Sequence, residues 1–436
     1  MSGSGAVPAA GTMQMDAPNP WRGGWRDGLP YGGLGLPLAF VALPLYVVLP
    51  NHYASVFGVP LALLGAVLLA ARLLDAVADP LIGRWADRLF ARSPRQALRV
   101  AAAAALVLVI GFRALFFPVV AGTTALLWWC AVVLGLTYLS YSVVTVIHQA
   151  WGARLGGGEA QRAQIVAWRE GLALAGVLVA SVLPSVAGLG ATTLVFAVML
   201  AVGLGLLLCA AQPNVPAPHS PATATALPLT TTAFRKLLAI YLVNGIASAV
   251  PATLVLFFIR DRLQAPSFEA LFLASYFAAG ACSIPLWVRA VRRFGLARTW
   301  LAGMLLAIAV FMWAAFIGAG DVVAYTAVCV LSGVALGADL TLPGALLAGV
   351  IQRAGHAGQA EGAYFGWWNF ATKLNLALAA GLALPALQAF GYAPGSQDPQ
   401  ALMALTVAYC GLPCLLKLAA AALLYTQWIR TPEGCA

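Results

Sequence analysis

The chain is divided into apolar runs that are each long enough to cross a membrane, and this pattern limits its fold more than any other feature. About 20 apolar residues span the hydrocarbon core of a bilayer, and only 9% of the 436 residues are charged. We therefore predict an all-α integral membrane protein. The predicted spans are 31–50, 60–84, 99–119, 123–150, 164–187, 190–211, 234–258, 267–289, 298–318, 321–350, 361–388 and 401–428.

A proline-rich segment separates these twelve spans into two sets of six. Five prolines stand among Ala and Thr between residues 212 and 232, a composition typical of a linker. We predict the following organisation: a disordered cytoplasmic tail at 1–29, a six-helix bundle at 30–211, a cytoplasmic linker at 212–232, a second six-helix bundle at 233–429 and a cytoplasmic tail at 430–436.

Basic residues are concentrated after spans 2, 4 and 8 and before span 7. The positive-inside rule places such segments in the cytoplasm, so we expect a multi-pass protein of the cell inner membrane with both termini cytoplasmic. The same rule accounts for the net charge of +10, which therefore does not indicate a nucleic-acid partner. No metal-ligand spacing of cysteines and no soluble catalytic motif is present, so we predict neither a metal site nor an enzyme.

Two carboxylates, Asp75 and Asp79, lie inside the apolar second span. A charge at the bilayer centre costs at least ~2.5–3.5 kcal/mol, so intramembrane acids indicate function. Arg72 shares their helical face, at spacings of i, i+3 and i+7. Because two carboxylates one turn apart cannot both ionise cheaply in a low dielectric, we expect a cation site that suits a proton. The alternative is a structural pairing with Arg72 or Lys373, and we expect Arg72 to be a counter-ion.

Residues 72–88 read Arg-x-x-Asp-Ala-x-x-Asp-Pro-x-x-Gly-x-x-x-Asp-Arg. This pattern resembles the glycoside-pentoside-hexuronide:cation symporters, the melibiose permease group of the major facilitator superfamily. Two further segments are similar to that family: His148-Gln-Ala-Trp-Gly-Ala-Arg-Leu155, and Lys373 within Asn369-Phe-Ala-Thr-Lys373. The resemblance implies the major facilitator fold, with two six-helix bundles around a central cavity that opens alternately to each side.

The resemblance also implies residue roles. Asp75 and Asp79 would bind the coupling cation, Lys373 would be a central positive group, and Arg169 would line the cavity or take part in gating. The chain departs from the family where members that bind sugars carry acids in spans 1 and 4, because Ala39 and Ser142 stand near those positions. A third departure is Ala78, where members that use sodium carry Asn, and it favours a proton over sodium.

Further candidates line the predicted cavity or its end. Asp339 in span 10 is a buried acid that could pair with Lys373 or bind a second proton. Trp368 and Asn369 could contact substrate, and packing or anchoring at the bilayer interface is the alternative. At the cytoplasmic end of span 2, Arg84, Asp87 and Arg88 are candidates for a gate of ion pairs, with topology-setting charge as the alternative. Lys417 in span 12 is assigned no role beyond pairing or snorkelling.

These observations predict a secondary transporter that couples symport of a small organic solute to H⁺, or alternatively Na⁺, without any other cofactor. Its expected partners are the solute, the cation and the lipid bilayer, and we expect it to work as a monomer. One alternative is an amphiphile or lysolipid carrier of the same fold, favoured by the missing sugar-binding acids. A non-transporting membrane sensor or scaffold is disfavoured, because it would not need the buried acids.

Overall fold

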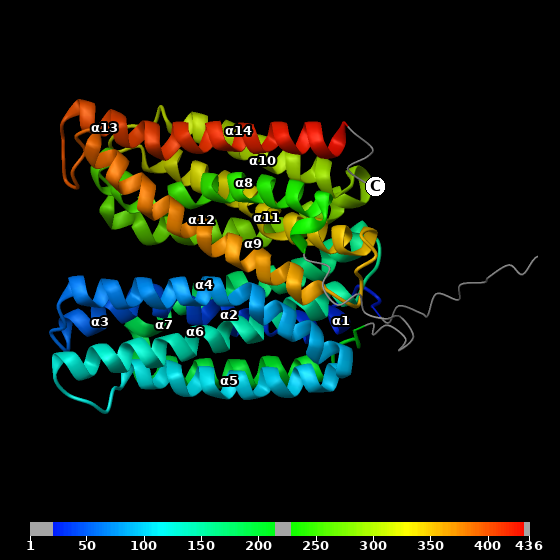
Figure 1. Ribbon diagram of the computed structural model, residues 1–436. Helices are drawn as coiled ribbons and strands as arrows, with labels where there is room; N and C mark the ends of the chain where they lie inside the picture. Colours follow the sequence, from blue (N-terminus) through cyan, green and yellow to red (C-terminus); the bar gives the residue numbers. More distant parts are fainter. Residues whose placement is uncertain (1–20, 214–227, 431–436) are drawn as a thin grey trace, which may run out of the picture.

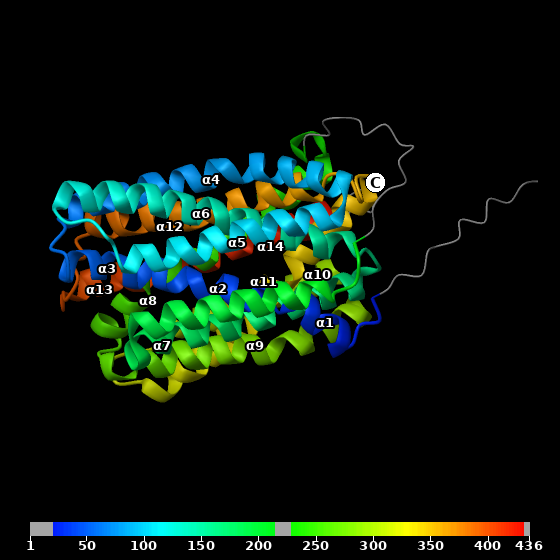
Figure 2. The same cartoon turned by 90° about the horizontal axis from the view of Figure 1, so that it is seen from below.

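The computed structural model describes residues 21–213 and 228–430, and this part of the chain forms two helical bundles (Figure 1). Helices of both bundles run along a common axis, in this view and in the one turned by 90° (Figure 2). The beginning of α1 and the end of α14 lie at the same end of the molecule. The predicted all-α fold is confirmed, while tail residues 1–20 and 431–436 and linker residues 214–227 lie outside the described residues.

The first bundle contains the helices α1 (Trp25–Gly32), α2 (Gly35–Leu43), α3 (Leu49–Ser55), α4 (Leu61–Arg92), α5 (Pro94–Phe116), α6 (Thr123–Arg154) and α7 (Glu159–Leu208). The second contains α8 (Thr232–Phe257), α9 (Glu269–Phe294), α10 (Leu296–Ala314), α11 (Val322–Arg353), α12 (Glu361–Ala389), α13 (Pro399–Thr406) and α14 (Leu412–Leu424). Short π-helical turns at Pro44–Val48, Phe258–Arg262, Val407–Gly411 and Tyr425–Ile429 and 3₁₀ turns at Pro228–Thr230 and Pro266–Phe268 complete the elements.

Proline and glycine explain where the predicted spans differ from single helices. Span 1 consists of α1, α2 and α3, with the turn at Pro44 between the last two, since proline has no N–H to donate within a helix. Residues 25–29, which we expected in the tail, are already helical. Spans 5 and 6 are joined in the 50-residue α7, which Gly188 breaks with a positive φ of 75° that only glycine adopts readily.

The described helices account for the twelve predicted spans. Nine helical segments of the described residues are long and apolar enough to cross a membrane. One of the nine is α7, whose two parts on either side of Gly188 each have span length. The other two spans are α4, with 32 residues, and α12, with 29, and these carry Asp75, Asp79 and Lys373.

α4 presents two different faces. Leu73, Val77 and Leu81, spaced four residues apart, are each more than half exposed and form an apolar stripe suited to contact lipid. Asp75 and Asp79 are buried on the other side. The sequence of α4 therefore places Asp75 and Asp79 in the protein interior while Leu73, Val77 and Leu81 face outward.

The two bundles touch mainly where α4 packs against α12 and where α7 packs against α9 and α11. Glycines allow the first contact, because a Cβ atom on Gly83 would overlap the carbonyl oxygen of Gly362. A Cβ atom on Gly366 would likewise overlap the carbonyl oxygen of Asp79. The backbones of α4 and α12 thus meet directly, and this brings Lys373 within reach of the acids.

This contact yields a prediction for Gly83→Ala. The added methyl group pushes α4 away from α12 and disfavours the packed arrangement by about 1–3 kcal/mol, as overpacking does elsewhere. Pulsed spin-label distances between the two helices should lengthen. Gly65→Ala is the matched control, because a Cβ atom at Gly65 of α4 meets no other atom within 4 Å; equal distances in the two variants would contradict the packing argument.

Candidate functional site

Lys373 of α12 forms ion pairs with both aspartates of α4. Its Nζ lies 2.7 Å from Oδ2 of Asp75 and 2.7 Å from Oδ2 of Asp79. The two acids are 3% and 0% exposed. Because α4 and α12 belong to different bundles, this cluster links the two halves through charge as well as through packing.

Ser142 of α6 completes the cluster. Its hydroxyl donates a hydrogen bond to Oδ1 of Asp75 at 2.6 Å and accepts one from Nζ of Lys373 at 2.9 Å. Oδ1 of Asp79, in contrast, is buried and has no hydrogen-bond donor among the described residues. One ammonium thus faces two carboxylates, of which one has an unsatisfied oxygen.

Arg72 is not the counter-ion that we expected. Its guanidinium lies over the ring of Tyr46, with Cζ 4.2 Å from the ring centroid. Within the described part of the chain, the positive partner of both acids is Lys373. The compact ammonium from the facing helix fits between the carboxylates, whereas the planar guanidinium is stabilised on an aromatic face.

A cavity of about 320 Å³ lies beside this cluster and is lined from both bundles. All six residues that we assigned to the substrate cavity line it: Ser142, Arg169, Asp339, Trp368, Asn369 and Lys373. The structure thus brings the six residues together around one cavity, and their binding of substrate stays a prediction.

Three lining residues that we did not predict contact those that we did. Nε and Nη2 of Arg169 donate to Oε1 of Glu170 at 2.9 and 2.7 Å. Gln149 accepts a hydrogen bond from Asn369 at 2.9 Å, and Tyr241 stacks on Trp368 with ring centroids 3.7 Å apart. Glu170 was signalled by its arginine neighbour, but nothing in the sequence around Tyr241 distinguishes it from other apolar span residues.

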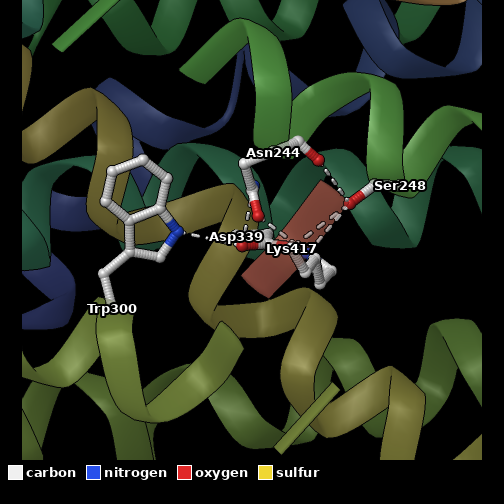
Figure 3. Close-up of polar contacts among 5 residues, drawn as sticks. All are labelled: Asn244, Ser248, Trp300, Asp339 and Lys417. Atoms are coloured by element: carbon white, nitrogen blue, oxygen red, sulfur yellow. Dashed lines mark hydrogen bonds and ion pairs between the residues drawn. The ribbon is translucent and has the colours of Figure 1, made fainter. Parts of the chain in front are cut away.

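Asp339 pairs with Lys417 of α14, as Figure 3 shows, whereas Lys373 pairs with Asp75 and Asp79. Lys417 Nζ lies 2.7 Å from Oδ2 of Asp339 and also donates to Asn244 Oδ1 at 2.9 Å. The carboxylate accepts further hydrogen bonds from Asn244 at 3.1 Å and Trp300 at 2.9 Å. Its positive partner and its neutral donors all come from the second bundle, an arrangement that favours a structural ion pair within that bundle over a second proton site.

At the end of the molecule where α1 begins, Asp87 joins the halves. Nη2 of Arg154 lies 2.8 Å from Oδ1 of Asp87 and 3.0 Å from Oε2 of Glu361. The carboxylate of Asp87 also accepts from the backbone N–H groups of Gly362 and Ala363 at 2.7 and 2.8 Å, at the N-terminus of α12, where the helix dipole favours a negative charge.

The arginines that we predicted beside Asp87 do not take part in this network. Arg84 and Arg88 are exposed and form no ion pair with the described residues. Arg154 takes their place because its side chain enters the interface from α6 and is buried. At the same end, Glu159 Oε2 accepts from the N–H of Leu296 at 2.9 Å, and Arg162 of α7 donates to Gln352 of α11, so further contacts also hold the bundles together.

The fold matches that of solved transporters over nearly its whole length. A bacterial homologue of the iron transporter ferroportin in an outward-facing state gives a TM-score of 0.66 at 16% identity, covering 91% of this chain and 99% of that one. The fucose:proton symporter FucP of E. coli gives 0.63 at 14%, with 90% and 98% covered. The human organic anion transporter MFSD10 gives 0.64 at 15%, with 94% and 100% covered. At these identities the likeness shows the fold alone, which is that of major facilitator transporters.

Sequence comparison then identifies the family. Residues 29–430 match the family of MFS/sugar transport proteins, and the chain belongs to this family. It is therefore a multi-pass membrane transporter and not an enzyme. The inner membrane symporter YicJ of Escherichia coli is 30% identical over 131 residues, a match that covers 30% of this chain and 28% of YicJ.

The Asp87 network predicts the effect of Arg154→Gln. The variant leaves the carboxylates of Asp87 and Glu361 buried near each other without a counter-charge, and removing one member of a buried ion pair costs about 3–5 kcal/mol. We expect a lower unfolding temperature in detergent and an opening of this end of the bundle. Arg88→Gln removes the same charge from an exposed site and should change little; equal losses would contradict the role of Arg154.

The ion pair between Asp339 and Lys417 predicts that substitutions of the two residues have non-additive effects on stability. Asp339→Leu and Lys417→Met should each lower the free energy of unfolding by about 3–5 kcal/mol, because each leaves an unpaired buried charge. The double variant removes both charges and should recover most of that loss. Chemical denaturation of the three variants measures the coupling. A double variant as unstable as the sum of the singles would show that the pairing is unimportant.

Proposed function

We propose that the protein is a symporter that couples the movement of a small polar organic solute to protons, with Asp75 and Asp79 as the cation site. The observation that carries this proposal is that one lysine of the second bundle is shared between two buried acids of the first bundle. Two carboxylates and one ammonium leave an excess of one negative charge in the membrane interior. A single proton on either acid removes that excess.

Protonation also changes the link between the halves. Asp79 is the acid best placed to receive the proton, since its Oδ1 has no donor among the described residues. A neutral Asp79 attracts Lys373 less, so the ion pair across α4 and α12 weakens. Lys373 then remains paired with Asp75 or turns toward an acceptor on the solute in the adjoining cavity.

The ligand set supports a proton over sodium. Asp75, Asp79 and Ser142 supply the oxygens of the cluster, and the ammonium of Lys373 occupies the position between the carboxylates. A hard metal cation prefers several oxygen ligands and no competing positive charge. A proton needs one carboxylate oxygen.

The cavity lining supports a polar solute over an amphiphile. Arg169, Glu170, Gln149 and Asn369 surround the space with charged and amide groups, which can replace the hydration shell of a polar molecule. An acyl chain would leave such groups unsatisfied. The lysolipid carrier is therefore the weaker candidate.

The network around Asp87 and Arg154 supports a gate at the end of the bundles that we predict to be cytoplasmic. In alternating access, this end must separate when the cavity opens toward the cytoplasm, and the ion pairs of Arg154 would break in that step. The name of the relative, an inner membrane symporter, supports the proposed location in the inner membrane, and the basic segments after spans 2, 4 and 8 support cytoplasmic termini.

The proposal is tested in proteoliposomes with a solute first found by thermal shift. A panel of sugars, organic acids and lysolipids is screened with and without sodium, because a ligand at 100 times its dissociation constant stabilises a protein by ~2.7 kcal/mol. An inward gradient of one pH unit should then drive about tenfold accumulation of a neutral solute at one proton per molecule.

Asp79→Asn should abolish this accumulation and leave exchange of labelled for unlabelled solute intact, because the site can no longer release a proton. Asp321→Asn, at an exposed acid far from the cavity, is the matched control and should accumulate solute normally. Accumulation by Asp79→Asn that still responds to the pH gradient would rule out this coupling site.

A further inference from the structure

A second large groove lies between α7 of the first bundle and α9 of the second. Its volume is about 550 Å³. The two helices touch within it, since a Cβ atom on Gly171 would lie 3.7 Å from Cδ1 of Ile284. The groove is separate from the solute cavity, and no residue lines both.

Each wall of the groove is one helical face. The wall on α9 is formed by Ala281, Ile284, Pro285, Val288, Arg289 and Arg292, a spacing of three and four residues that keeps side chains on one side of a helix. The wall on α7 follows the same spacing, with Gln164, Ala167, Trp168, Gly171 and Leu172.

Polarity changes along the groove in the same direction on both walls. Arg289, Arg292 and Gln164 stand toward one end, near the junction where Glu159 contacts Leu296. Residues farther from that end are apolar: Trp168 and Leu172 on α7, and Ile284 and Val288 on α9. A molecule that fits this gradient has a polar group at the end of the bundle and an apolar body inside the membrane.

The positive charge at the polar end of the groove favours an anionic ligand. Arg289 and Arg292 are exposed, and they form no ion pair with the described residues. The groove has no acidic lining residue among those described. Arginine binds phosphate through paired N–H donors, and basic pockets between membrane helices on the cytoplasmic side bind the head groups of anionic lipids.

We propose that this groove binds an anionic phospholipid, with its phosphate between Arg289 and Arg292 and an acyl chain along Trp168, Val288 and Ile284. Because α7 and α9 belong to different halves, the bound lipid contacts both. It therefore stabilises the arrangement in which the groove has this shape, and the balance between transporter conformations depends on the anionic lipid of the surrounding leaflet.

The test measures lipid retention on the full-length protein. Wild type and Arg289→Gln/Arg292→Gln are placed in nanodiscs of phosphatidylcholine with increasing phosphatidylglycerol, and bound phosphatidylglycerol is counted by native mass spectrometry after mild release. Loss of two arginine contacts should weaken retention about 30-fold. The matched control, Arg293→Gln/Arg298→Gln, removes two exposed charges that do not line the groove, and its retention should stay within about threefold of wild type.

A second variant tests the contribution of the apolar part of the groove. Ala281→Phe fills the groove without changing its charge and should also reduce phosphatidylglycerol retention while the unfolding temperature in detergent stays unchanged. Equal losses in the two arginine double variants would show general surface attraction and overturn the proposal. Competition by inorganic phosphate that displaces the lipid completely would also overturn it, because the acyl chain would then contribute nothing.

Discussion

The structure depends on the ion pairs between Lys373 and the two aspartates of α4. These groups lie in a membrane interior, where an unpaired charge is strongly unfavourable, so each half needs the other to satisfy its charges. The contact is possible only because glycines let α4 and α12 approach closely. Charge and packing at this one place therefore determine how the bundles fit together.

The same interface explains how the two bundles can have more than one stable arrangement relative to each other. Besides the packing of α7 against α9 and α11, the halves meet through polar contacts. These include Lys373 and the Asn369–Gln149 hydrogen bond in the middle, and contacts of Arg154, Glu159 and Arg162 at one end. Each bundle has its own apolar core, and a third apolar cluster joins residues of α7 to residues of the second bundle. A rearrangement of the halves therefore breaks the polar contacts and the α7 part of this third cluster, while the two separate cores stay intact and the bundles move as units.

The two buried ion pairs contrast in a way that bears on function. The carboxylate of Asp339 is surrounded by donors from within its own bundle, including Lys417 and Trp300. Asp79 has its positive partner on the opposite bundle and one oxygen without a donor among the described residues. The Asp339 pair therefore suits a permanent structural element of its bundle. Asp79 instead suits a site whose charge changes during a transport cycle.

The sequence by itself indicated the spans, the two-bundle organisation and six residues that line the cavity, because apolar length and isolated charges in apolar runs are local features. It also indicated Asp75, Asp79 and Lys373 as a set. Only the tertiary structure decided the pairings: Asp339 with Lys417, Asp87 with Arg154, and Arg72 with Tyr46. Each partner lies on another helix, and helical spacing shows which face a charge occupies but not which helix that face meets.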